Sequence, residues 1–142
     1  MTTKEYLKSY KNLLYKIEDL EREIEELEEQ ITSVSSLLGD GMPRGSGVSS
    51  KLDRLMPLLV DKKKHKEELK AEAIMKRLEI EEVIDEIKDE PISCRLLKDK
   101  YIRAMTWGET TEDLGYANES YVAGPLHKKA LRLAAEVMQA RQ

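Results

Sequence analysis

The chain has 142 residues and a net charge of −4; 37% of its residues are charged, 5% are aromatic, and Phe is absent. This composition excludes a large globular core and favours an all-α protein with long helices, because abundant Glu, Lys, Leu and Ile is typical of coiled coils. Cys94 is the single cysteine, so we expect no intrachain disulfide, no metal site and no cofactor. The amphipathic N-terminus and the lack of an apolar run of roughly 18 residues predict a cytoplasmic protein with no membrane partner.

The first element is a long helix with one apolar stripe that ends near Leu38. The stripe residues follow one another at steps of four and three, as in a coiled coil: Tyr6, Tyr10, Leu13, Ile17, Leu20, Ile24, Leu27, Ile31 and Val34. Ile at heptad position a with Leu at heptad position d would suit a parallel dimer. The segment from Glu18 to Glu29, however, holds eight acidic residues and one Arg, so a parallel copy would bring like charges together.

A Gly-rich loop at about 39–50 separates this helix from a second long one. Four glycines and Pro43 in residues 39–47 are typical of a loop. Ser49 or Ser50 is the expected cap of the second helix, and Pro57 is a candidate kink.

The second helix is predicted to fold back on the first. Its apolar positions are Leu52, Leu55, Leu59, Leu69, Ala73, Ile74, Leu78, Ile80, Val83, Ile84 and Ile87. In an antiparallel hairpin, Lys62 to Lys66 would lie beside Ile24 to Leu20, within the acidic run. Exposed ion pairs contribute only about 0.2–1 kcal/mol each, so they would set the orientation while apolar burial supplies stability. A lysine run also suits nucleic-acid contact, but the acidic neighbour would cancel its field.

The domain boundary is expected before Pro91, which divides the chain into a coiled-coil hairpin (1–90) and a helix-turn-helix domain (91–142). Proline disfavours helical backbone in the residue before it and suits the first turn of a new helix. Residues 1–90 carry 16 basic and 22 acidic side chains, whereas residues 91–142 carry 8 basic and 6 acidic ones. The net charge therefore changes from −6 to +2, which favours phosphate contacts in the second domain.

The helix-capping and helix-ending residues of the second domain predict a helix-turn-helix. Thr106 and Glu109 have the spacing of a capping box, so a helix should begin at Trp107. Gly115 suits the left-handed residue that ends a helix, and Asn118 suits the cap of the next one. The expected core of this domain is Ile92, Leu96, Leu97, Tyr101, Ile102, Met105, Trp107, Leu114, Tyr116, Tyr121, Leu126 and Leu131. Cys94 is interpreted as a minor core residue.

The helix capped by Asn118 is the expected recognition helix. Its N-terminal end would read base edges through Asn118, Glu119, Ser120, Val122 and Ala123. Pro125 removes a helical hydrogen bond, so we expect either a kink or a short turn followed by a new helix from Pro125. In the second case phosphate contacts would come from His127, Lys128, Lys129 and Arg132. A solvated face that balances Glu136 is the alternative for the last three of these.

Several of these residues also carry a family resemblance, namely Leu96-Leu97, Tyr101-Ile102, Met105-Thr106-Trp107, Leu114-Gly115-Tyr116, Leu126-His127 and Ala130-Leu131. The run resembles the C-terminal domain of phage late-gene transcription regulators (RinA/ArpU-like), whose helix-turn-helix is similar to region 4 of sigma factors. The resemblance implies a phage or prophage protein that binds promoter DNA and acts on host RNA polymerase in the bacterial cytoplasm. The loop around Arg44 is similar to one in the same family, which implies a partner contact; a flexible hinge is the alternative.

Two classes of function remain. Catalytic carboxylates need a concave pocket, whereas the acidic residues here mostly lie on the predicted hairpin, so we expect no enzyme. The first hypothesis is a transcription regulator that binds double-stranded DNA, with the hairpin serving self-association or RNA polymerase contact. The second is a coiled-coil interaction module whose helix-turn-helix docks a protein.

Overall fold

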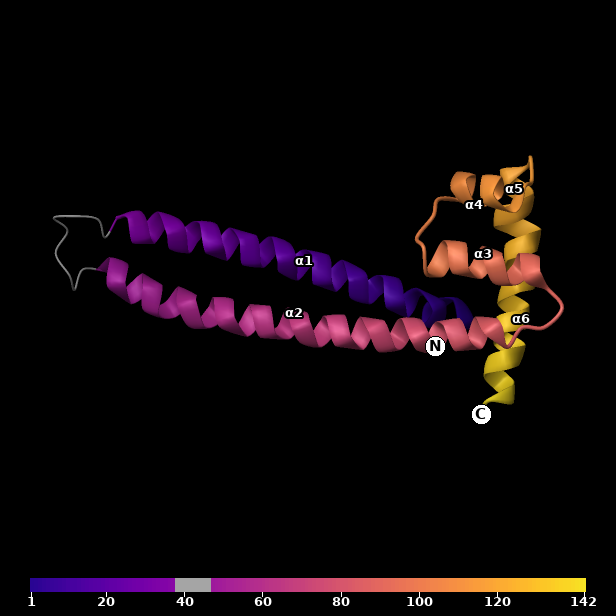
Figure 1. Cartoon of the computed structure of the whole chain (residues 1–142), viewed down its shortest axis with the longest axis horizontal. Coiled ribbons are helices and arrows are strands. Elements are labelled where there is room, and N and C mark those ends of the chain that lie inside the picture. Colours follow the sequence, from indigo (N-terminus) through magenta and orange to yellow (C-terminus); the bar gives the residue numbers. More distant parts are fainter. Residues whose placement is uncertain (38–46) are drawn as a thin grey trace. The chain divides into compact units, whose positions relative to one another are not determined.

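The computed structural model describes residues 1–37 and 47–142, and these residues are almost entirely helical (Figure 1). The elements are α1 (Thr3–Ser36), α2 (Gly47–Asp85), α3 (Pro91–Tyr101), α4 (Trp107–Leu114), α5 (Glu119–Tyr121), the π-helical turn η1 (Val122–Leu126) and α6 (His127–Ala140). No strand occurs in the two described ranges. The predicted all-α fold with a long N-terminal helical hairpin is therefore confirmed. None of these helices is both long enough and apolar enough for a bilayer span.

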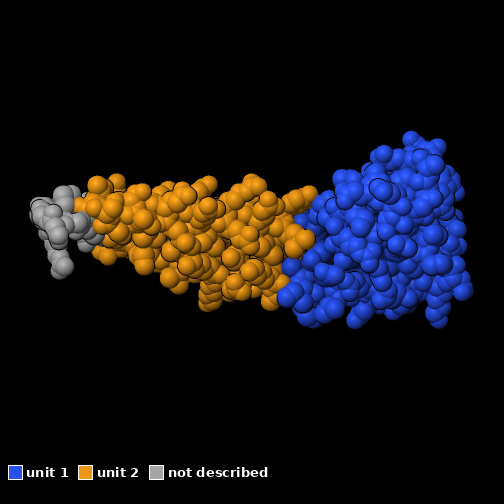
Figure 2. Space-filling view, turned by 45° about the horizontal axis from the view of Figure 1, so that its top comes forward, with its two compact units in different colours: residues 1–12, 73–142 blue, residues 13–72 orange. Residues whose placement is uncertain are grey.

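The chain divides into two compact units, which Figure 2 colours separately. One unit contains Met1–Asn12 together with Ala73–Gln142, and the other contains Leu13–Glu72. The start of α1 and the end of α2 thus belong to the same unit as α3 to α6. The expected boundary before Pro91 falls inside this first unit.

The Leu13–Glu72 unit is the antiparallel pairing of α1 with α2. Its buried side chains repeat along the predicted stripe: Leu13, Ile17, Leu20, Ile24, Leu27 and Leu69. The Nζ of Lys62 lies 2.9 Å from the Oε2 of Glu23, and the Nζ of Lys63 lies 3.6 Å from the Oε1 of Glu28. The basic run therefore meets the acidic run, as the charge pattern predicts.

Three details of α2 differ from the sequence expectation or refine it. The helix begins at Gly47, before Ser49 and Ser50, so the expected caps lie within its first turn. It continues through Pro57. Ile74 and Leu78, placed in the core from sequence, are 62% and 49% exposed. The buried stripe instead follows heptad steps from Leu69 through Ala73 to Ile80, which leaves both residues on an adjacent face.

Arg44, the predicted partner contact in the Gly-rich loop, lies outside the described residues.

The first unit has an apolar core to which α1, α2, α3, η1 and α6 contribute. Its buried apolar side chains are Leu7, Tyr10, Ala73, Ile80, Val83, Ile84, Ile87, Leu96, Leu97, Tyr101, Ile102, Val122, Ala130 and Ala134. Thr2 and Glu5 form a capping box at the start of α1: the Thr2 N–H donates to Glu5 Oε2 at 3.0 Å, and the Glu5 N–H donates to Thr2 Oγ1 at 3.1 Å. This capping box satisfies two backbone N–H groups at the start of α1.

The predicted core of residues 91–142 is correct at its centre and wrong at its edge. Leu96, Leu97, Tyr101 and Ile102 are buried. Met105, Trp107, Leu114, Leu126 and Leu131 are half-buried. Ile92, Tyr116 and Tyr121 are exposed. Ile92 lies in the first turn of α3, and the two tyrosines pack against each other at the surface, with ring centroids 5.7 Å apart. Small residues of α6, Ala130 and Ala134, fill the space instead.

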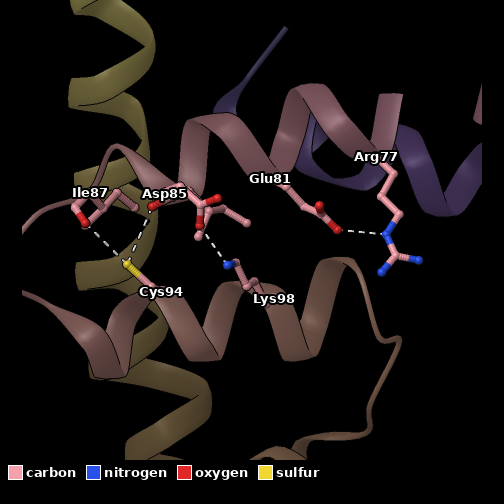
Figure 3. A network of polar contacts seen from close by, with 7 residues as sticks. Arg77, Glu81, Asp85, Ile87, Cys94 and Lys98 are labelled. Atoms are coloured by element: carbon pink, nitrogen blue, oxygen red, sulfur yellow. Dashed lines mark hydrogen bonds and ion pairs between the residues drawn. The ribbon is translucent and has the colours of Figure 1, made fainter. Parts of the chain in front are cut away.

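Polar contacts tie α3 to the end of α2 (Figure 3). The Cys94 thiol lies 3.5 Å from the carbonyl oxygens of Ile84 and Ile87. The Nζ of Lys98 donates to Asp85 at 2.7 Å. Burial raises the pKa of the Cys94 thiol, which keeps it protonated and weakly nucleophilic. The interpretation of Cys94 as a minor core residue agrees with this position.

Candidate functional site

The helices α4 and α5 meet at a turn whose caps match the sequence prediction. The Glu109 N–H donates to Thr106 Oγ1 at 3.1 Å, and the Thr106 N–H donates to Glu109 Oε1 at 3.2 Å. Gly115 has a φ of 78°, the left-handed conformation that favours glycine. The Asn118 side chain accepts a hydrogen bond from the Tyr121 N–H at 3.3 Å. We name Trp107–Tyr121 the α4–turn–α5 unit.

An ion pair fixes α4 against α3. The Arg95 guanidinium donates two hydrogen bonds of 2.8 Å to the Asp113 carboxylate. Such bidentate pairs add geometric specificity. The hydrogen bonds from Arg95 hold the pKa of Asp113 below its usual value, so the pair persists across the neutral range. The orientation of the α4–turn–α5 unit on α3 therefore rests on a defined polar contact as well as on packing.

The chain stays helical across Pro125. The backbone of Tyr121, Val122, Leu126 and His127 is right-handed helical, and Val122–Leu126 forms a π-helical turn. A π turn widens the helix by one residue and so accommodates a position that has no N–H to donate. Of the two expected outcomes, a kink or a new helix that starts at Pro125, the second is therefore wrong. Residues 119–140 form one helical run, which we name the α5–α6 run.

The expected base-reading residues divide into exposed and buried ones. Asn118, Glu119 and Ser120 are exposed at the start of the α5–α6 run. Val122 is fully buried, so it is unavailable to a base edge, and its assignment to the binding face is corrected. Ala123 is half-buried.

The expected phosphate contacts divide in the same way. His127 is only 7% exposed and lines a separate cavity with Tyr101 and Trp107, which corrects its assignment to the same phosphate-contacting face as Lys128. Lys128, Lys129 and Arg132 are exposed. Together with Gly124 and Pro125 they line a shallow cavity of about 440 Å³. We name Lys128, Lys129 and Arg132 the α6 basic patch. Lys129 also pairs with Glu90 at 2.9 Å, so part of its charge is neutralised.

A second basic site escaped the sequence prediction. Lys4, Lys8 and Lys11 of α1 and Lys100 of α3 line a cavity of about 320 Å³. Its other walls are Tyr101, Trp107, Ala123 and His127. We name this cavity the lysine pocket. The spacing i, i+4, i+7 of the three α1 lysines places them on one helix face. That spacing was a readable signal, but nothing in the sequence indicated that Lys100 would join them.

The interior of the lysine pocket holds a neutral histidine. The Tyr101 hydroxyl and His127 Nε2 share a hydrogen bond of 2.7 Å, and the Trp107 ring packs edge-on against the imidazole at 4.8 Å between centroids. Burial, reinforced by the positive charges of Lys4, Lys100 and Lys8, lowers the pKa of His127 to about 4. At neutral pH the phenol donates to Nε2 when Nδ1 carries the ring proton.

Lys100 lies at the centre of this environment. Its Nζ donates to the Met105 carbonyl at 2.6 Å and lies 4.3 Å from the centroid of the Trp107 ring. Burial and then the charge of Lys11 lower its pKa, while Glu109 and Glu119 oppose that shift. The half-buried position of Trp107 agrees with the expectation of a structural role for this residue.

The model of the family DUF1492, described as proteins of unknown function, matches residues 35–132. The chain belongs to the DUF1492 family. The matched segment includes the α4–turn–α5 unit and Lys128, Lys129 and Arg132. Searches among curated proteins and among solved structures found no match. The family description names no activity, so a functional proposal for this DUF1492 member has to rest on its own geometry.

Proposed function

We propose that this protein is a DNA-binding transcription regulator that places the start of the α5–α6 run in the major groove of promoter DNA. The α4–turn–α5 unit supports the proposal. In a DNA-binding helix-turn-helix, the residues at the N-terminal end of the second helix contact base edges. Here Asn118, Glu119 and Ser120 occupy that end and are exposed.

The α6 basic patch supports the same role. Lys128 and Arg132 lie on the α5–α6 run beyond the base-reading end and are exposed, where a cation can contact a backbone phosphate. Phosphate contacts of this kind position a protein on the duplex, while base contacts specify the sequence. We therefore assign phosphate contact to Lys128 and Arg132 and base contact to Asn118 and Ser120.

The wider setting follows from the family resemblance stated above. We propose a phage or prophage regulator that acts in the bacterial cytoplasm together with host RNA polymerase. The paired α1 and α2 helices of the Leu13–Glu72 unit offer a surface for polymerase contact or for association with a second copy.

The test is a selection of duplexes from a random-sequence pool, followed by fluorescence anisotropy with an enriched and a scrambled duplex. We expect the wild type to bind the enriched duplex at least about 10³-fold more tightly than the scrambled one. The Ser120→Ala substitution should lower this ratio. Absence of any enrichment would overturn the proposal.

The phosphate contacts are tested with Lys128→Gln/Arg132→Gln against Lys16→Gln/Lys64→Gln, a control that removes two exposed lysines of α1 and α2. Each lost phosphate contact should lower the slope of log K against log salt by about 0.9, which is about eightfold in affinity at about 0.1 M salt. An equal effect of both double substitutions would remove the assignment of Lys128 and Arg132.

A second candidate is the docking of a protein partner on the α4–turn–α5 unit. Exposure of Glu119 and of the Tyr116–Tyr121 ring pair favours it, because an acidic group repels DNA phosphates and exposed tyrosines are enriched at protein interfaces. In the same selection, this candidate predicts no enriched duplex. Binding of the full-length protein to purified RNA polymerase, lost in the Tyr116→Ala/Tyr121→Ala variant, would then support the protein-docking candidate.

A further inference from the structure

We infer that the lysine pocket binds a backbone phosphate of the same DNA duplex whose bases the start of α5 contacts. The inference rests on the proposed function and adds a second, separate phosphate contact to it. Three of its four lysines, Lys4, Lys8 and Lys11, come from the first turns of α1, more than a hundred residues before the recognition helix in sequence.

Geometry places the pocket on the α5–α6 run itself. Ala123 and His127 of the run line the lysine pocket, whereas Gly124, Lys128 and Arg132 line the cavity of the α6 basic patch. Successive residues of a helix are rotated by about 100° around its axis. The row of Ala123 and His127 and the row that starts at Gly124 therefore lie on neighbouring faces. Lysines of α1 and α3 therefore flank one face of the α5–α6 run, and the α6 basic patch occupies a neighbouring face. A helix in the major groove is flanked by a phosphate backbone on each side, and the groove is about 12 Å wide.

The charge of the pocket suits an anion. Four lysines line it, and no Asp or Glu is among its lining residues in the described part of the chain. Glu109 and Glu119 act on Lys100 from outside, and one oxygen of Glu109 is held by the Thr106 N–H. Lys4 and Lys8 form no ion pair within residues 1–37 and 47–142. A purely structural site would place a carboxylate beside Lys4 and Lys8, because like charges repel.

The size and walls of the pocket suit a phosphate. The volume of about 320 Å³ corresponds to about ten water molecules, which leaves room for a phosphodiester group with part of its hydration. The rings of Trp107 and Tyr101 exclude water on one side and lower the local dielectric constant, which strengthens the attraction between an ammonium group and an anion.

The test compares Lys4→Gln/Lys8→Gln with Lys16→Gln/Lys64→Gln. Both double substitutions remove two positive charges from exposed positions of the long helices, and glutamine keeps a helix propensity close to that of lysine. The full-length proteins are titrated with the enriched duplex by fluorescence anisotropy across a salt series. Thermal unfolding followed by circular dichroism verifies that both variants fold.

For Lys4→Gln/Lys8→Gln we expect about eightfold weaker binding at about 0.1 M salt and a slope reduced by about 0.9. The control should change affinity by less than about twofold, because neither Lys16 nor Lys64 lines the lysine pocket. Trp107, the single tryptophan of the chain, lines the pocket. Its emission should change when the duplex binds to the wild type and change less with Lys4→Gln/Lys8→Gln.

The remaining outcomes overturn the inference in distinguishable ways. If the wild type binds the duplex and both double substitutions weaken it equally, the pocket has no phosphate contact, while the proposed function stands. If the wild type binds no duplex, the proposed function fails together with the inference. If inorganic phosphate alone changes Trp107 emission while Lys4→Gln/Lys8→Gln leaves DNA affinity unchanged, the pocket takes a free phosphate and the assignment to DNA is wrong.

Discussion

The buried His127 makes a defined contribution to the dependence of stability on pH. Its pKa is about 4 in the folded protein, lowered from 6.5 first by burial and then by Lys4, Lys100 and Lys8. Between these two values the unfolded chain binds a proton that the folded chain does not. The free energy of unfolding therefore falls as the pH decreases through this range, and the full stability is present above about pH 6.5.

The magnitude follows from the two pKa values. One pKa unit corresponds to about 1.4 kcal/mol. With His127 at about 4 in the folded state and 6.5 in the unfolded state, lowering the pH from 7.5 to 5.0 removes about 2 kcal/mol. A change of this size is a large fraction of the stability of a small protein, which is typically about 5–15 kcal/mol.

Urea unfolding at pH 7.5 and pH 5.0, followed by circular dichroism, measures this contribution of His127 to the free energy of unfolding. The His127→Gln variant retains a hydrogen-bonding side chain but cannot titrate, so it should lose about 2 kcal/mol less than the wild type over this interval. Carboxylates titrate in the same range in both proteins, and their contribution cancels in the difference. His65→Gln, which removes the exposed histidine of α2, is the matched control. Equal losses in the wild type and His127→Gln would refute the reasoning.

Three further predictions concern the stability of the fold, measured by urea unfolding. Gly115→Ala should cost about 1 kcal/mol because Gly115 has a φ of 78°, whereas Gly108→Ala, at a helical position where a Cβ meets only ordinary contacts, should stabilise α4 by up to about 1 kcal/mol. Leu97→Ala should cost about 2–5 kcal/mol because Leu97 is fully buried. Ile74→Ala should change stability by less than about 0.5 kcal/mol because Ile74 is exposed. Equal losses in the two variants would contradict the assigned core. Lys62→Ala should cost less than about 1 kcal/mol at low salt, and the loss should shrink in about 1 M salt because the ion pair is screened.

The sequence predicted the parts of the fold that depend on local chemistry. The caps at Thr106 and Asn118 and the glycine at 115 are short-range signals, since each acts on a backbone group within a few residues. The apolar stripe of α1 and the opposite charges of Lys62 and Glu23 predicted the antiparallel pairing, because periodicity and charge are both readable without the fold.

The candidate site was harder to predict because it depends on contacts between distant segments. Pro125 was expected to end or kink a helix, but a π turn absorbs the missing hydrogen bond, and helix propensity gives no indication of this outcome. His127 was predicted to contact a phosphate because it would lie near the start of a final helix begun at Pro125. Its burial results from Tyr101 and Trp107, which come from other helices. Lys100 joins Lys4 and Lys8 only in the folded chain.

The placement of Met1–Asn12 with Ala73–Gln142 makes this unit discontinuous in sequence. Its fully buried Leu7 comes from the first segment, and its buried Ala134 comes near the end of the chain. A nascent chain on the ribosome therefore cannot complete this unit until its last helix has emerged. For the same reason, a fragment that starts at Pro91 lacks part of the core and three of the four lysines of the lysine pocket, so expressing residues 91–142 alone is a poor substitute for the intact protein.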